Sequence, residues 1–374
     1  MRWLLLVTLA GCKFSPDQAA GDDAVIKDAP DDATPDTPPD AFDPLCYGGG
    51  AFYFCLPAPP PGPVTLADGD LDTTACTASG AAPAQIGGIA VCLLHATTLT
   101  VAGNVGIFGS KPLVLVASTT LTVDSNGSLD ASSGVTAMFP GPGSDPSDCV
   151  GTTIDGTAGG NGGGGGAGGS FGTPGGNGGT GNAGAGGTAS DAATLPITKL
   201  RGGCMGGVGA PGGGDRAVPG RGGGVVFLAA HETIAVNGVI NASGAGGEGG
   251  NTSKGGGAGG GSGGLIVFHA ATLSVSLGAR IVANGGGGGA GAGQGQVGAN
   301  GADPDATMPA MPAPGGTTST GGATPGGNGA ALASQPGNGN NGGGGGGGGG
   351  GGSGVIRVLA GGTIPVSVVS PPPG

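Results

Sequence analysis

The chain of 374 residues contains 98 glycines and 30 prolines, carries a formal net charge of −12, and has only 9% charged and 3% aromatic residues. Without a basic stripe to neutralise phosphates, nucleic acid is excluded as a partner, and few aromatic rings argue against ring-stacking recognition of sugars. Glycine and proline at this level are typical of low-complexity chains. The valine, leucine and isoleucine residues nevertheless gather in segments of strand length, so a small core can form.

The N-terminal residues have the pattern of a bacterial export signal. Arg2 supplies a positive charge, residues 3–9 form an apolar run too short to span a bilayer, and small residues follow. The sequence Leu9-Ala10-Gly11-Cys12 resembles the lipobox of bacterial lipoproteins. That resemblance implies that residues 1–11 are a lipoprotein signal peptide and that Cys12 is lipidated as the mature N-terminus. Because the segment is short for such a signal, an ordinary secretory signal and an uncleaved anchor are the alternatives.

Residues 12–44 are rich in Asp, Pro and Ala. Such a segment buries too little apolar surface to offset its ordering entropy, so we expect a disordered tether behind the lipidated N-terminus. Its Asp residues lack the Asp-x-Asp-x-Asp-Gly spacing of a calcium loop. The predicted location is therefore outside the cytoplasm, on a lipid anchor in the outer membrane or at the cell surface.

Seven cysteines are present, and lipidation of Cys12 would leave an even number. An even set is what an exported disulfide framework requires. Many pairings are open to six cysteines, and we predict pairing between sequence neighbours. The sequence contains no Cys-x-x-Cys motif, which argues against a zinc ribbon and against a redox site. The expected pairs are Cys46 with Cys55, Cys76 with Cys92, and Cys149 with Cys204.

A similar segment of about 22 residues recurs along the chain, and such internal repetition is the sequence signature of repeat architectures. It starts at Pro112, Gly224, Gly264 and Gly354, and more weakly at Gly88. Each copy has an apolar run, a small or polar corner, an alternating run and a short tail, which together predict three short strands. Stacked copies would share one core as an all-β, short right-handed parallel β-helix (β-solenoid). A β-sandwich of the same strands, with disordered glycine loops, is the alternative.

The alternating runs identify the residues that should face the core. Thr122, Ala235 and Ser274 would then face outward, and Pro365, which cannot donate a ladder hydrogen bond, suits an edge coil. The predicted inward residues are Leu121, Val123, Ile234, Val236, Leu273, Val275, Leu277, Ile364 and Val366.

The repeats divide the rest of the chain into three parts. Residues 45–134 would form a cysteine-containing cap and the first β coils. Residues 135–221 would form a glycine-rich insertion, and residues 222–374 would form β-solenoid coils with glycine-rich loops.

Glycine tracts separate the repeats. They leave each repeat after its tail, which predicts that all emerge along one edge of the stack. In some tracts a residue other than glycine recurs at every third position, as at Ala245, Glu248, Asn251 and Lys254. Three residues per turn is the repeat of a polyproline II (PPII) helix. Faces made only of glycine would let such helices bond side by side, whereas flexible loops are the alternative. The tracts cover residues 156–187, 202–224, 244–264, 285–301 and 315–354.

The GGxGG tracts resemble the glycine-rich repeats of mycobacterial PE-PGRS proteins and the polyglycine sandwiches of some phage adhesins, although no PE-type helical domain is present. Lipobox, Asp/Pro tether and strand–glycine alternation together are similar to glycine-rich surface lipoproteins of myxobacteria. This resemblance covers most of the chain. It implies a non-enzymatic structural or adhesive role, with the membrane, cell-surface polysaccharide or other surface proteins as partners.

Candidate catalytic and metal-binding residues are sparse. His95, His231 and His269 fall at strand corners of different repeats, and only His231 with His269 suggests a weak metal site. We expect no cofactor and no resident metal. The competing function is a polysaccharide-degrading or polysaccharide-binding β-helix protein, for which Arg280, Arg357 and His269 are the candidates, but no carboxylates face the arginines. The calcium-binding nonapeptide GGxGxDxUx is missing.

Overall fold

A computed structural model describes residues 43–77, 81–135, 139–149, 154–193, 195–251, 254–318 and 322–374. The predicted signal peptide, Cys12 and nearly all of the predicted tether lie outside the described residues. Residues 44–374 form one compact unit. No helix among the described residues has both the length and the apolar character needed to span a membrane.

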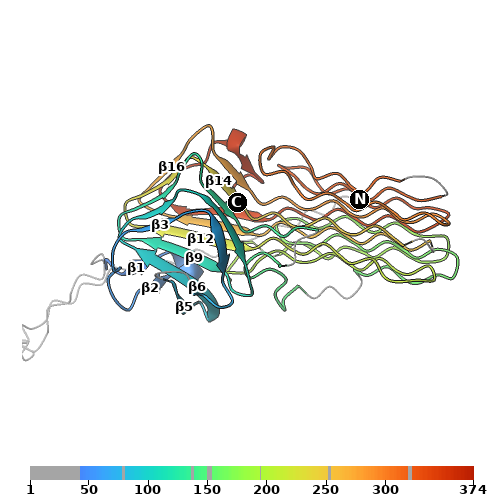
Figure 1. The fold of residues 1–374 in the computed structure, drawn as a ribbon, viewed down its shortest axis with the longest axis horizontal. Helices are drawn as coiled ribbons and strands as arrows, with labels where there is room; N and C mark the ends of the chain where they lie inside the picture. Colours follow the sequence, from blue (N-terminus) through green and yellow to red (C-terminus); the bar gives the residue numbers. More distant parts are fainter. Residues whose placement is uncertain are drawn as a thin grey trace, which may run out of the picture. The chain divides into compact units, whose positions relative to one another are not determined.

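The unit is built on three sheets whose strands are almost all parallel, which confirms the all-β prediction (Figure 1). Sheet I consists of β5 (Ala81–Ile86), β6 (Ile89–Ala96), β9 (Leu113–Ala117), β12 (Val225–Ala230), β15 (Leu265–His269) and β18 (Val355–Ala360). Sheet II consists of β3 (Val64–Leu66), β7 (Leu99–Val101), β10 (Thr120–Val123), β13 (Thr233–Val236) and β16 (Thr272–Val275). Sheet III consists of β4 (Gly69–Asp72), β8 (Asn104–Phe108), β11 (Ser128–Asp130), β14 (Val239–Asn241), β17 (Arg280–Val282) and β19 (Val369–Ser370).

The chain visits the three sheets in rotation. From β6 onward, each predicted repeat contributes one strand to sheet I, the next to sheet II and the third to sheet III. Equivalent residues of successive repeats pair in register, as Leu121 does with Leu99 on one side and Ile234 on the other. In the last repeat a 3₁₀ turn, η2 (Val366–Val368), replaces the strand of sheet II, so that sheet ends at β16.

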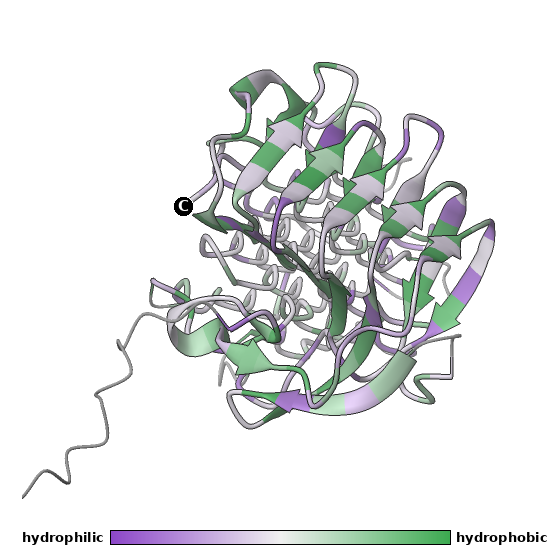
Figure 2. Cartoon of the chain, turned by 90° about the vertical axis from the view of Figure 1, so that its left-hand side faces the viewer, coloured by the Kyte–Doolittle hydropathy of each residue, from purple (hydrophilic) through white to green (hydrophobic). Residues whose placement is uncertain are grey.

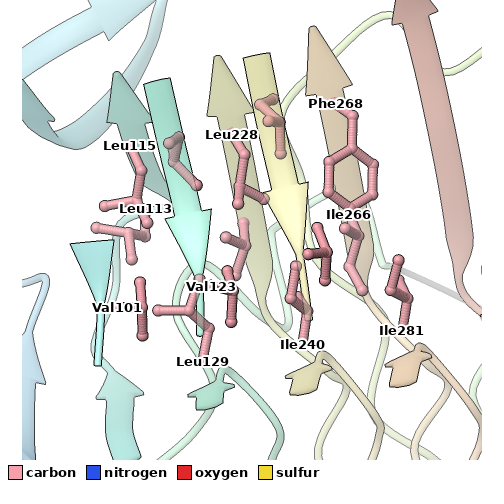
Figure 3. Close-up of a cluster of buried hydrophobic side chains, with 14 of the residues drawn as sticks. Val101, Leu113, Leu115, Val123, Leu129, Leu228, Ile240, Ile266, Phe268 and Ile281 are labelled. Carbon is pink, nitrogen blue, oxygen red and sulfur yellow. The ribbon is translucent and has the colours of Figure 1, made fainter. Parts of the chain in front are cut away.

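The inward residues of all three sheets form a single hydrophobic core (Figure 3). Leu121, Ile234 and Leu273 are buried in it as predicted. Two predicted core residues are wrong: Leu277 is 77% exposed and Val366 is 74% exposed. In both cases the sequence alternation continues past the point where the strand ends, because Leu277 follows β16 and Val366 lies in η2.

The central strands of sheet I, β9, β12 and β15, are buried on both faces, which is why they are continuous apolar runs rather than alternating ones. In β9, Leu113 and Leu115 point into the main core, whereas Val114 and Val116 join a second cluster on the opposite face. This cluster includes aromatic residues of the hairpin formed by β1 (Cys46–Tyr47), η1 (Gly50–Phe52) and β2 (Phe54–Cys55). Strands of sheet II, by contrast, alternate green and pale along their length in Figure 2.

Among the strands of sheets I to III, three were not predicted from the sequence. β3 and β4 add a partial coil before the first predicted repeat, and they pair in parallel with β7 and β8. β5 closes the edge of sheet I by pairing antiparallel with β6. These segments are short or contain Asp and Pro, so they lack the apolar alternation by which the other strands were recognised.

A pair of leucine substitutions tests the assignment of the core. Leu228→Ala removes a fully buried side chain and should lower the free energy of unfolding by roughly 2 to 5 kcal/mol. Leu277→Ala deletes the same atoms from an exposed site and should change it by less than about 0.5 kcal/mol. Urea unfolding of both variants measures this, and equal losses would contradict the assignment.

Candidate functional site

The glycine tracts form one assembly at a single corner of the sheets. Three excursions leave the strands, each after a strand of sheet III and before a strand of sheet I. They span residues 131–224, 242–264 and 283–354. Each excursion crosses the assembly more than once, and we call each such extended stretch of chain a pass. The passes run alongside one another in Figure 1. This is the common edge that the sequence predicts.

Backbone hydrogen bonds join the passes at every third residue. Gly163, Gly166 and Gly169 donate N–H to the carbonyls of Lys254, Gly257 and Gly260, with N···O distances of 2.9 to 3.0 Å. At the same spacing, N–H groups of residues 257–263 donate to carbonyls of residues 346–352. N–H groups of residues 346–352 in turn donate to carbonyls of residues 163–169. Three passes thus close a ring of bonds. A repeat of three with partners in neighbouring passes is the behaviour of packed PPII helices, and Figure 2 shows the passes end-on as pale spirals.

The strand register continues into the passes. β14 pairs with β17, and beyond these strands Gly244, Gly247 and Gly250 donate to Asn284, Gly287 and Ala290 with one constant residue offset. β15 pairs with β18 in the same way, and residues 257–263 keep a constant offset to residues 346–352. The sheets therefore fix how the glycine passes align.

Residues 342–352, an uninterrupted glycine run, lie inside the assembly. N–H groups of residues 345–352 donate to three passes, and carbonyls of residues 346–352 accept from three others, at N···O distances of 2.8 to 3.0 Å. The run is therefore surrounded by six passes. The six contain residues 163–169, 286–292, 337–340, 257–263, 176–179 and 327–330.

Close approach of these passes excludes side chains from the run. A Cβ at Gly348 would overlap the carbonyl oxygen of Ala258, well inside the 3.0 Å that real Cβ atoms keep. Gly343, at the start of the same run, would place a Cβ in open space. Ala258 and Ala290 are nevertheless fully buried in the bundle. Whether a side chain fits therefore depends on the neighbours of each individual position.

Asparagine side chains accept backbone amides at the exposed side of the bundle. The backbone N–H of Asn177 is bonded to Oδ1 of Asn338 at 2.8 Å, and that of Thr180 to Oδ1 of Asn341 at 2.7 Å. Asn300 and Asn328 accept from Gly249 and Gly315 in the same manner. These exposed amides are thereby satisfied by a side-chain carbonyl of the adjacent pass instead of a backbone carbonyl.

The cysteines pair as predicted. Disulfides join Cys46 to Cys55, Cys76 to Cys92, and Cys149 to Cys204. The first closes the aromatic hairpin on sheet I, and the last spans the outer passes of the first excursion.

Two of the three histidines, His231 and His269, contact the hairpin and the residues before it. His269 Nδ1 accepts a hydrogen bond from the N–H of Gly48 at 3.2 Å. His231 lies 2.8 Å from the carbonyl of Pro44 and stacks on Tyr47 at 4.1 Å. Burial, and then the charge of His231, lower the pKa of His269. In the part of the chain that the structure describes, no histidine belongs to a group of three or more metal-ligand residues.

The candidate residues for polysaccharide cleavage are not brought together in one sheet. Arg280 lies in sheet III, whereas Arg357 and His269 lie in sheet I. Arg280 donates to the carbonyl of Ala279 at 2.7 Å, and Arg357 to that of Ile197 at 2.8 Å. Their guanidinium groups are thus engaged with the backbone. His95 lies in β6, and its Nδ1 is buried.

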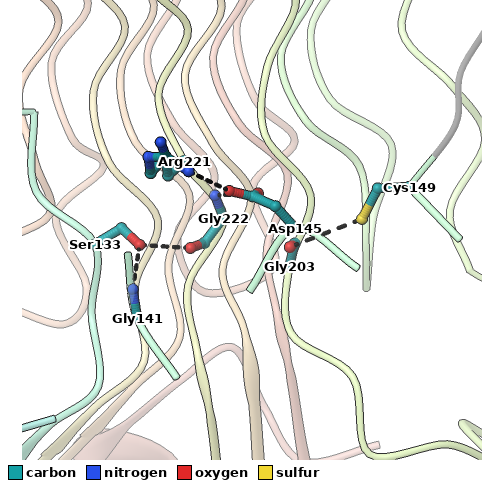
Figure 4. Close-up of polar contacts among 7 residues, drawn as sticks. All are labelled: Ser133, Gly141, Asp145, Cys149, Gly203, Arg221 and Gly222. Carbon is teal, nitrogen blue, oxygen red and sulfur yellow. Dashed lines mark hydrogen bonds and ion pairs between the residues drawn. The ribbon is translucent and has the colours of Figure 1, made fainter. Parts of the chain in front are cut away.

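Sequence reasoning missed a polar network at the foot of the passes (Figure 4). Asp145 Oδ1 accepts the N–H of Gly222 at 2.9 Å, and its Oδ2 lies 3.6 Å from Arg221 Nη1. Ser133 donates its hydroxyl to the carbonyl of Gly222 at 2.6 Å and accepts the N–H of Gly141 at 2.9 Å. The network ties residues 131–145 to the returning pass before β12.

Asp145 is an unusual carboxyl group. Its side chain is only 9% exposed. Burial raises the pKa of Asp145 from 3.8 to about 6, although the bond from Gly222 and the charge of Arg221 lower it. Its backbone has φ of 49°, a left-handed conformation that Asp and Asn tolerate better than other side chains. No sequence motif surrounds it, and Asp148 lies only three residues further on.

No family model, curated protein or solved structure matches the chain. Its function is therefore argued from its own residues.

Gly348→Ala and Gly343→Ala form a matched pair within one run. The first places a methyl group against a carbonyl and should lower the free energy of unfolding by roughly 2 to 4 kcal/mol through overpacking and a lost hydrogen bond. The second should be neutral or stabilising by up to about 1 kcal/mol, because alanine reduces the entropy of the unfolded chain. Thermal unfolding compares them. Equal midpoints would mean that the run is not enclosed.

Asp145→Asn tests the raised pKa. Between about pH 4 and 6 folded Asp145 keeps a proton that the unfolded chain releases, so its stabilising contribution is complete below the unfolded pKa of 3.8 and is lost as pH rises through about 6. That contribution is at most about 3 kcal/mol. Asparagine keeps the acceptor but cannot ionise, so the variant should lose less stability than the wild type between these pH values. Urea unfolding at both pH values measures this, and identical losses would contradict it.

Proposed function

We propose that the chain is a non-enzymatic cell-surface lipoprotein in which a short right-handed parallel β-helix displays a rigid bundle of PPII glycine helices with a structural or adhesive role. The observation that carries this proposal is the network of backbone hydrogen bonds between the passes. It supports an ordered bundle in place of flexible loops, and order is what a surface element needs if it is to carry force or make contacts.

The strand arrangement supports the β-helix. The chain rotates through three parallel sheets, equivalent residues pair between successive repeats, and one core receives side chains from every sheet. A β-sandwich would instead be built from two facing sheets, usually of antiparallel strands.

Export and surface location rest on the N-terminal sequence and on the disulfides. The pairing of all six cysteines that follow Cys12 fits an oxidising compartment. The lipobox resemblance at Cys12 then supplies the anchor, and the Asp- and Pro-rich segment after it supplies a spacer between membrane and bundle. Cell-surface polysaccharide and other surface proteins are the partners that this setting offers.

The anchor is tested by expression in a Gram-negative host. We expect the wild-type chain to partition with membranes, to begin at Cys12, and to carry the added mass of diacylglycerol and an acyl chain. Cys12→Ala should be released as an unlipidated protein, whereas Ser15→Ala, three residues on, should behave as the wild type. Intact mass spectrometry of each form measures this. An unlipidated wild-type chain would contradict the proposed address.

The role of the bundle is tested on the same cells. Gly348→Ala should reduce attachment of cells to a surface, while Gly343→Ala should leave it unchanged at equal surface amounts of protein. Equal attachment by both variants and by cells without the protein would contradict an adhesive role.

A further inference from the structure

A cleft of about 950 Å³ lies at the foot of the passes. Its walls come from the ends of β4 and β8 and from residues 139–148 and 199–205. The volume falls in the range of small-molecule sites, about 300 to 1,000 Å³. The Cys149–Cys204 disulfide ties two of these walls together, so the cleft is preformed.

Buried polar atoms in need of a partner gather in this cleft. Among the described residues, five buried side-chain polar atoms have no hydrogen-bond partner. Three of the five belong to cleft residues: Ser144 Oγ, Arg201 Nε and Asp145 Oδ2, which lies 3.6 Å from Arg221 Nη1, beyond hydrogen-bond distance. A buried polar atom without a partner costs about 1 to 3 kcal/mol. A hydroxyl, a carboxyl oxygen and a guanidinium N–H together match a ligand whose groups both donate and accept.

An aromatic platform stands in the same cleft. Phe108, at the end of β8, and Phe139 stack with ring centroids 4.6 Å apart and planes inclined by 22°. Phe139 is 51% exposed. The face of an aromatic ring carries partial negative charge, which attracts the polarised C–H groups on the apolar face of a pyranose. The two residues lie in segments without a shared motif, so the sequence shows no such platform.

The charges that line the cleft are balanced. Asp72, Asp145 and Asp148 line it together with Lys199, Arg201 and Arg221, and Lys199 is paired with Asp148 at 3.0 Å. A balanced lining gives no net preference for an anion or a cation. It suits a ligand rich in hydroxyl groups and free of charge.

We propose that this cleft binds a neutral saccharide, with one pyranose ring stacked on Phe139 and its hydroxyl groups bonded to Ser144, Asp145 and Arg201. The proposal rests on the proposed adhesive function and deepens it by naming the ligand class. Recognition would then reside at the foot of the bundle, next to the sheets, where the site is held by the disulfide and the Asp145 network.

Isothermal titration of the full-length chain in detergent tests the proposal. The probes are cellotetraose, mannotetraose, galactotetraose and chitotetraose, with tetragalacturonate as the charged counterpart. We expect saturable binding of at least one neutral probe and none of the uronate. Phe139→Ala should weaken that binding at least tenfold, whereas Tyr53→Ala, which removes a similarly exposed aromatic (56%) outside the cleft, should leave it unchanged.

Arg221→Gln provides a second variant should Phe139→Ala unfold. The Arg221 side chain is 52% exposed. Its loss should weaken saccharide binding because the Asp145 carboxyl group then loses the guanidinium that holds it in place. Absence of binding to every neutral probe, binding of the uronate alone, or unchanged affinity in both cleft variants would overturn the proposal. Because titration needs neither cell nor membrane, its failure would leave anchoring and attachment untouched, and loss of anchoring in Cys12→Ala would leave titration unchanged.

Discussion

The hydrogen bonds between glycine passes are the constraint on which the rest of the structure depends. An extended PPII chain makes no internal hydrogen bonds, and buried amides and carbonyls need partners. In this protein each interior pass meets that need with its neighbours, which requires close approach and therefore glycine. The longest glycine run occupies the site with six neighbouring passes, while asparagine side chains accept backbone amides at the exposed side of the bundle. Composition and position thus follow from one requirement.

The sheets make this bundle possible by fixing where the passes begin and end. Successive excursions start from adjacent strands of sheet III and return to adjacent strands of sheet I. The register of the strand pairs continues into the passes with the same residue offset. A chain of this composition pays a large entropic cost on ordering, and anchoring both ends of each excursion on paired strands removes part of that cost. The order of the glycine bundle therefore depends on the pairing of the strands that flank it.

Much of the strand region could be predicted from the sequence, whereas the cleft could not. Alternation places Leu121 and Ile234 in the core, and pairing of sequence neighbours gives all three disulfides. Alternation fails at Leu277, where the pattern outlasts the strand. Order in the glycine tracts could not be decided, because it depends on the number of neighbouring passes. Phe139, Asp145 and Arg201 come from segments without periodicity, so only the folded chain brings them together.

Hydrogen exchange of the amides of residues 345–352 in the intact protein tests the central claim most directly. If these amides are bonded to surrounding passes, they should exchange orders of magnitude more slowly than an unstructured glycine peptide, with protection comparable to that of β12. Exchange at the rate of an unstructured peptide, while β12 stays protected, would show that the tracts are flexible loops and would contradict the account.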